Sequence, residues 1–115
     1  MKKYIPFIIL SFYLFSPISV YAAEKYTVYL EINNGEFIPP VLNVPTNKII
    51  RIKISNIGNQ PAEFESTQLR KEKVLAPGAS SVVIIAPLRQ GTYTFFDDFH
   101  LENLHGKIIA KEPSQ

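Results

Sequence analysis

The chain has 115 residues, of which 12 are Lys or Arg and 10 are Asp or Glu, and it contains no cysteine. The lack of cysteine excludes disulfides and thiolate chemistry, so an apolar core must stabilise the fold. Lys2 and Lys3 account for the net charge of +2, and no clustered basic face indicates nucleic-acid binding.

The N-terminal segment has the pattern of a secretory signal peptide. A positive start precedes an apolar run from Ile5 to about Val20, and small residues follow at the usual cleavage positions. A membrane anchor is the rival interpretation, but the run is shorter than the ~20 residues of a spanning helix, and Pro17 interrupts it. We therefore expect a signal peptide over residues 1–22 and one periplasmic domain over residues 23–115, which meets the membrane only during export.

Beyond the N-terminal segment, apolar residues recur with a period of two, which is typical of strands. The alternation covers residues 26–32 and 50–54. Residues 81–86 are more uniformly apolar, as expected for a strand that is covered on both faces. Residues 92–97 form a further strand that places Asp97 on the same face as two aromatic residues, and a short strand over 107–111 follows.

Turn signals separate these strands, among them Asn33-Asn34-Gly35, Asn56-Ile57-Gly58-Asn59 and Pro77-Gly78. No apolar stripe with helical spacing and useful length follows the N-terminal segment. Short strands joined by frequent turns predict an all-β protein, a single β-sandwich of about seven strands.

Four segments, in this order, resemble the cupredoxins, a family that includes blue copper proteins such as plastocyanin. They are Phe37 to Pro45, Ile50 to Gly58, Leu75-Ala76-Pro77-Gly78 with the apolar strand after it, and Gly91 to Phe96. The resemblance spans nearly all of residues 23–115. It implies a Greek-key sandwich that holds metal ligands at one pole.

The ligand positions of plastocyanin-like proteins can be carried over onto this sequence. The cysteine position falls on Asp97, the loop histidine on His100 and the methionine position on His105. The upstream histidine falls on Ala62, or on Glu63 if the turn is one residue longer. Only His100 keeps its residue type, and a type 1 copper site is excluded because that site requires a thiolate.

The chain is also similar to a narrower group, the cupredoxin-like domains found with bacterial periplasmic iron-uptake components. Glu63-Phe64-Glu65-Ser66 and Glu72 to Gly78 carry this similarity. It implies iron or copper handling beside an inner-membrane metal permease or exporter.

Carboxylate and imidazole ligands suit Cu(II) or iron, and we predict a metal site formed by Asp97, His100, His105 and Glu63. Further oxygen donors are Glu65, Asp98 and Glu102. Each predicted ligand has a structural alternative. The histidines can be surface or turn residues, Asp97 can be a paired or hydrated group at the rim, and Glu63 with Glu65 can form a solvent-facing edge that discourages aggregation.

These observations predict a periplasmic metal-binding protein that captures or passes Cu(II) or iron near a membrane transport system. The alternative is a metal-free interaction module on the same scaffold, since a fold does not fix a function. No Ser-His-Asp order, HExxH helix or phosphate-binding glycine loop is present, so we do not expect an enzyme.

Overall fold

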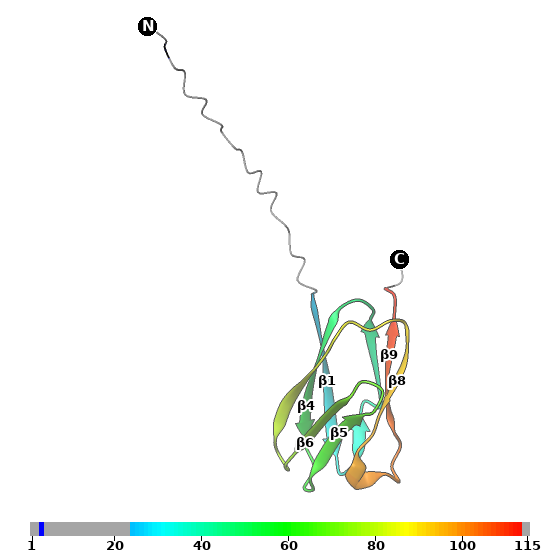
Figure 1. The fold of residues 1–115 in the computed structure, drawn as a ribbon. Coiled ribbons are helices and arrows are strands. Elements are labelled where there is room, and N and C mark those ends of the chain that lie inside the picture. Colours follow the sequence, from blue (N-terminus) through cyan, green and yellow to red (C-terminus); the bar gives the residue numbers. More distant parts are fainter. Residues whose placement is uncertain (1–2, 4–23, 114–115) are drawn as a thin grey trace.

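The computed structural model describes residue 3 and residues 24–113 (Figure 1). The predicted signal peptide, apart from Lys3, lies outside this part of the chain and stays a prediction. In the described part, no helix has the length and hydropathy needed to cross a membrane.

The prediction of an all-β sandwich is confirmed. The described residues form nine strands instead of about seven, and the sandwich also carries one 3-10 helix, η1, of a single turn. The elements are β1 (Lys25–Asn33), β2 (Glu36–Ile38), β3 (Val41–Pro45), β4 (Ile49–Asn56), β5 (Ala62–Ser66), β6 (Lys71–Leu75), β7 (Ser80–Ile85), β8 (Gly91–Phe95), η1 (Asp98–His100) and β9 (Gly106–Lys111).

Two layers make the sandwich. One is a four-stranded sheet in the order β2-β1-β4-β7, and the other is a three-stranded sheet in the order β3-β9-β8. Two pairs are parallel, β1 with β4 and β3 with β9, so both layers contain crossover connections. The β5–β6 hairpin joins the second layer through an antiparallel bridge between Glu65 and Phe96.

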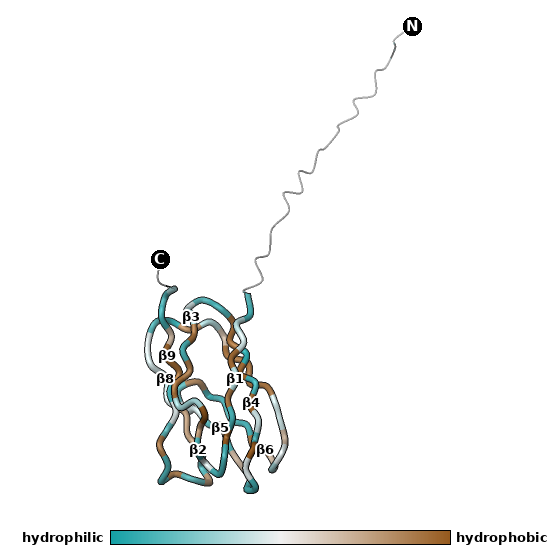
Figure 2. Tube along the Cα trace, turned by 180° about the vertical axis from the view of Figure 1, so that it is seen from behind, coloured by the Kyte–Doolittle hydropathy of each residue, from teal (hydrophilic) through white to brown (hydrophobic). Residues whose placement is uncertain are grey.

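The core lies between the layers and follows the predicted alternation. Ile50, Ile52 and Ile54 of β4 are fully buried, and hydrophobic positions recur along the strands of both layers (Figure 2). At its centre the ring of Phe95 packs edge-on against Phe37 and in a tilted arrangement against Phe64, with centroids 4.8 Å apart in both pairs. Such aromatic pairs stabilise the core beyond their burial alone.

The prediction that residues 81–86 are covered on both faces is wrong. Strand β7 is an edge strand, and its outward side chains Val82 and Ile84 are 39% and 45% exposed. Its inward residues Val83 and Ile85 are buried. Among residues 24–113 no third layer covers this face, so its apolar side chains are exposed.

The two ends of the described chain lie at one end of the sandwich, and η1 lies at the other (Figure 1). The backbone oxygens of Glu24 and Lys111 accept hydrogen bonds from the N–H groups of Ile49, the first residue of β4, and Thr46, the first residue after β3. The opposite end, called the tip below, comprises η1 with the loop to β9, the β1–β2 turn and the β4–β5 loop. It is the predicted pole for metal ligands.

Candidate metal centre

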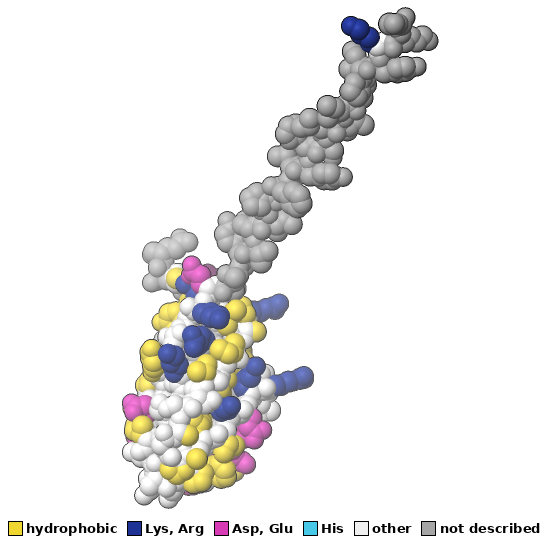
Figure 3. Space-filling model, turned by 90° about the vertical axis from the view of Figure 1, so that its left-hand side faces the viewer, with side chains coloured by type: hydrophobic (Ala, Val, Ile, Leu, Met, Phe, Trp, Pro, Cys, Tyr) yellow, Lys and Arg dark blue, Asp and Glu magenta, His cyan; other side chains and the backbone are white. Residues whose placement is uncertain are grey.

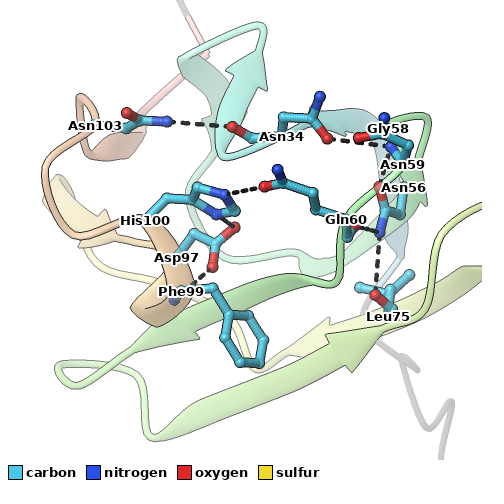
Figure 4. Close-up of polar contacts among 10 residues, drawn as sticks. All are labelled: Asn34, Asn56, Gly58, Asn59, Gln60, Leu75, Asp97, Phe99, His100 and Asn103. Carbon is cyan, nitrogen blue, oxygen red and sulfur yellow. Dashed lines mark hydrogen bonds and ion pairs between the residues drawn. The ribbon is translucent and has the colours of Figure 1, made fainter.

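Asp97 is placed between β8 and η1 by a local turn. It is only 2% exposed and is the N-cap of η1, whose single turn is closed by a hydrogen bond of 2.9 Å from the backbone N–H of His100 to the Asp97 carbonyl oxygen. Its Oδ1 accepts a hydrogen bond of 2.9 Å from the backbone N–H of Phe99. Its Oδ2 lies 3.2 Å from Nδ1 of His100 (Figure 4). Both oxygens of this buried carboxylate therefore have a partner.

His100, the last residue of η1, links this helix to the β4–β5 loop. Its Nε2 lies 2.8 Å from Oε1 of Gln60, and its side chain is 14% exposed (Figure 4). The loop that carries Gln60 is fixed by Asn56, whose side-chain amide donates to the carbonyl oxygens of Gln60 and Leu75 at 2.8 and 3.1 Å. The ring of His100 thus joins its own turn to the β4–β5 loop, which is 40 positions away in the sequence.

The partners of His100 bear on which of its ring nitrogens carries a hydrogen. When Nδ1–H donates to Asp97, Nε2 of a neutral ring carries a lone pair and needs a donor or a metal ion. Gln60 can supply an amide N–H after rotation about its terminal bond, whereas its Oε1 pairs with a protonated ring. A carboxylate that accepts from one ring nitrogen while the other is free to ligate is the usual arrangement of histidine in metal sites.

His105 is not brought to this pair. It is exposed, and its ring packs against Phe96 with centroids 5.6 Å apart. Across residues 24–113, Asp97, His100 and His105 do not form a cluster of three side chains with ligand atoms within 4.8 Å of one another. The ligand role of His105 stays a prediction.

Glu63 belongs to a different cluster. Ligand atoms of Glu63, Glu65 and Glu72 all lie within 4.8 Å of one another. Glu63 and Glu65 share one face of β5, and the register pairs Glu65 directly with Glu72 of β6. Glu63 is 3% exposed, so it is not the solvent-facing edge residue of the alternative interpretation.

The environment of Glu63 disfavours its charge. Its Oε1 is buried without a hydrogen-bond partner. Burial, and then the neighbouring carboxylates of Glu65 and Glu72, raise the pKa of Glu63 to about 8. Near neutral pH the side chain is therefore largely a neutral acid unless a cation replaces its proton.

Sequence reasoning found some of these residues and missed others. It did not identify Gln60, although this residue stands two positions before Ala62, the expected place of the upstream ligand. Ala62 itself points into the core and is 1% exposed. The sequence pattern indicated Glu65 only as a further oxygen donor, and it did not place Glu72 in a site. Asp98 and Glu102 are exposed and outside the carboxylate cluster.

Comparison with known proteins agrees with this architecture. The family model described as a cupredoxin-like domain matches residues 5–110. The uncharacterized protein RP394 of Rickettsia prowazekii (strain Madrid E) is 38% identical over 85 residues, which cover 74% of this chain and 68% of that protein.

Several solved structures share the fold at low identity. The Cu(I)-bound metal binding domain of the Cu(I) exporting P-type ATPase CopA from Streptococcus pneumoniae D39 has a TM-score of 0.65 and 12% identity, over 76% of this chain and 87% of that chain. A copper binding protein in its apo form has a TM-score of 0.64 and 19% identity, over 76% and 88%. The purple cupredoxin from Nitrosopumilus maritimus has a TM-score of 0.58 and 16% identity, over 73% and 99%.

These likenesses establish the fold, and the family match covers nearly the whole sequence. The lack of cysteine excludes the type 1 copper site of the blue cupredoxins. The chain belongs to the cupredoxin-like domain family.

Proposed function

We propose that this protein binds Cu(II) or iron in the periplasm and passes the ion to or from an inner-membrane permease or exporter. The ion is a cargo in this proposal, and the protein is not a blue-copper electron carrier. Two of the structural neighbours are a copper exporter domain and a copper binding protein, which supports copper as one candidate cargo.

The observation that carries the proposal is the contact of 3.2 Å between Asp97 Oδ2 and His100 Nδ1. It fixes the ring and leaves Nε2 at the tip, beside the amide of Gln60. A buried carboxylate that orients a partly exposed imidazole raises the basicity of the ligating nitrogen. The geometry therefore supports His100 as a ligand and Asp97 as the group that positions it.

The donor types suit the proposed cargo. Imidazole nitrogen, amide oxygen and carboxylate oxygen bind Cu(II) and iron, whereas Cu(I) prefers sulfur donors. With no thiolate present, bound Cu(II) should give a pale protein without the intense colour of a type 1 site.

Titration of the protein with Cu(II), followed by calorimetry and EPR, tests this function. We expect an EPR signal from nitrogen and oxygen ligands, and weaker binding by about tenfold or more in His100→Ala. Asp98→Asn, an exposed carboxylate beside Asp97, is the matched control and should bind as wild type. Unchanged Cu(II) and iron binding in the Asp97→Ala, His100→Ala double variant would exclude the proposed site.

A metal-free interaction module is the second candidate function. Both nitrogens of His100 already have protein partners, so the network is complete without a metal. Apolar side chains are exposed on the same loop, namely Phe99 at 53%, Leu101 at 55% and Leu104 at 78%. Figure 3 views the left-hand side of Figure 1, where hydrophobic side chains are spread among charged ones.

Metal content separates the two functions. A protein purified without chelators that contains no metal by mass spectrometry, and whose melting temperature does not respond to Cu(II) or iron, favours the interaction module. A rise in melting temperature on adding metal favours the binding function, because a ligand that binds only the folded state stabilises it.

A further inference from the structure

We propose that Glu63, Glu65 and Glu72 form a metal site of their own, separate from His100, that binds an oxygen-preferring divalent cation. The site lies on the β5–β6 hairpin and uses none of the residues of the Asp97–His100–Gln60 network. It therefore does not rest on the function proposed above.

The backbone register brings the three carboxylates together. Residues two apart on a strand point to the same face, so Glu63 and Glu65 are neighbours on β5, and Glu65 lies opposite Glu72 on β6. Their ligand atoms lie within 4.8 Å of one another. Carboxylate oxygens sit about 2.0–2.4 Å from a bound divalent cation, so oxygens at such separations can contact one ion.

Burial of Glu63 distinguishes this cluster from acidic groups that merely share a protein surface. It is 3% exposed, and its Oε1 is buried with no hydrogen-bond partner. A buried carboxylate oxygen without a partner costs free energy unless a proton, a donor or a cation compensates it. Its side chain reaches the two other carboxylates, so a cation held there would supply the missing partner.

The three carboxylates repel one another, and none of them has an ion-pair partner among the described residues. The ion pairs of the described residues involve Glu24 and Asp97. No Lys, Arg or His nitrogen of these residues therefore lies within 4.0 Å of a carboxylate oxygen of Glu63, Glu65 or Glu72. The raised pKa of Glu63 has the same origin, since like charges and burial oppose its ionisation. A divalent cation would reverse this effect by neutralising the repulsion.

Solvent reaches the site from one side. Glu65 is partly buried and Glu72 is exposed. Both belong to the lining of a surface hollow of about 270 Å³, which consists of Glu65, Ser66, Thr67, Arg70, Lys71 and Glu72. Glu63 does not line this hollow, but its carboxylate has a ligand atom within 4.8 Å of those of Glu65 and Glu72, so an ion that these two residues hold from solvent would also be within reach of Glu63.

The donor set selects the class of ion. Three carboxylates and water form an all-oxygen site, which suits Mn(II) and other hard divalent cations and does not suit Cu(I). Protons compete with the cation for Glu63, so binding should strengthen as pH rises.

Titration of the protein with Mn(II) at about pH 8 tests the site, because the EPR signal of free Mn(II) decreases when the ion binds. We expect one bound ion in wild type and a Kd raised at least tenfold in Glu63→Gln, which keeps the shape of the side chain. Glu72→Gln, a change at an exposed position, should also weaken binding while leaving the fold intact. Glu112→Gln, an exposed carboxylate outside the cluster, and His100→Ala should bind Mn(II) as wild type.

The variants distinguish this inference from the proposed function. Loss of Mn(II) binding in Glu63→Gln with retention in His100→Ala supports the site, whatever Cu(II) does at His100. Wild-type protein that leaves the Mn(II) signal unchanged at millimolar concentration overturns the inference. So does a Kd in Glu63→Gln and Glu72→Gln equal to that of Glu112→Gln. Circular dichroism of each variant establishes that it is folded.

Discussion

The ring of His100 packs directly on the backbone of Gly35, in the turn between β1 and β2. Gly35 has φ +85°, and a Cβ at this position would lie 2.5 Å from Cβ of His100 and closer still to its ring. The same Cβ would meet Nδ2 of Asn103 at 2.5 Å. The position of the candidate ligand therefore depends on the absence of a side chain more than sixty positions earlier in the sequence.

Gly35→Ala should displace His100 and weaken Cu(II) binding. We expect a loss of about 2–4 kcal/mol in the free energy of unfolding, since backbone strain at positive φ and an overpacked contact both contribute. Gly78→Ala is the matched control, because Gly78 has φ +79° but a Cβ there would meet no atom within 4 Å. Chemical denaturation and calorimetric Cu(II) titration of both variants check this. Equal effects in the two variants would contradict the role of the contact with His100.

Asp97→Asn should distinguish the role of Asp97 in orienting the His100 ring from its role in stabilising the fold. The amide oxygen can still accept from Phe99, but the charge that holds the His100 ring is gone. We expect Cu(II) affinity to fall by about 10–100-fold, while the free energy of unfolding falls by only about 1–2 kcal/mol. Calorimetry and urea denaturation measure the two quantities. Wild-type Cu(II) affinity in Asp97→Asn would mean that Asp97 does not position the ligand.

Glu63 predicts a pH dependence of stability. The unfolded chain releases the proton of this side chain near pH 4.5, whereas the folded protein holds it until about pH 8. The folded state thus binds more protons between these values, and its stability falls as pH rises through this interval.

Urea denaturation of the metal-free protein at several pH values between about 5 and 8 measures this fall. Glu63→Gln should reduce the pH dependence strongly, because the amide does not titrate. Glu112→Gln, at an exposed position, should retain the wild-type slope. A slope that is the same in all three proteins would show that Glu63 is not the titrating group.

Gly106→Ala tests the packing at the start of β9. A Cβ at this position would overlap the Phe95 ring, which is fully buried between Phe37 and Phe64. We expect a loss of about 1–3 kcal/mol in the free energy of unfolding. In Gly106→Ala, Phe95→Leu the smaller side chain makes room, so the double variant should lose less than the sum of the single changes. Additive losses would indicate that the two residues do not compete for space.

Much of the fold could be predicted because one-sided strands leave a local signal. The alternation of Ile50, Ile52 and Ile54 and the shared face of Phe95 and Asp97 both match the observed burial. Strand β7 misled the prediction because a run of apolar residues does not reveal how many layers cover it. Exposed Val82 and Ile84 have the same side chains that a doubly covered strand would have.

The site was predictable only where it is local. Asp97 and His100 are three residues apart, so one turn of 3-10 helix brings them into contact. Gln60 reaches the same ring from 40 positions away, and Glu72 meets Glu65 through a strand register. Those contacts depend on loop geometry and strand register, which the local spacing of residues in a single sequence does not reveal.

The placement of both chain ends beside the β3–β4 connection has a practical consequence for handling the protein. A tag, a spacer or a sensor surface joined to residue 24 or residue 113 would be attached at the far end from η1 (Figure 1). Immobilised molecules would therefore present their imidazole outward to the flowing solution, so ion uptake and partner capture can be recorded on the same chip without blocking the tip.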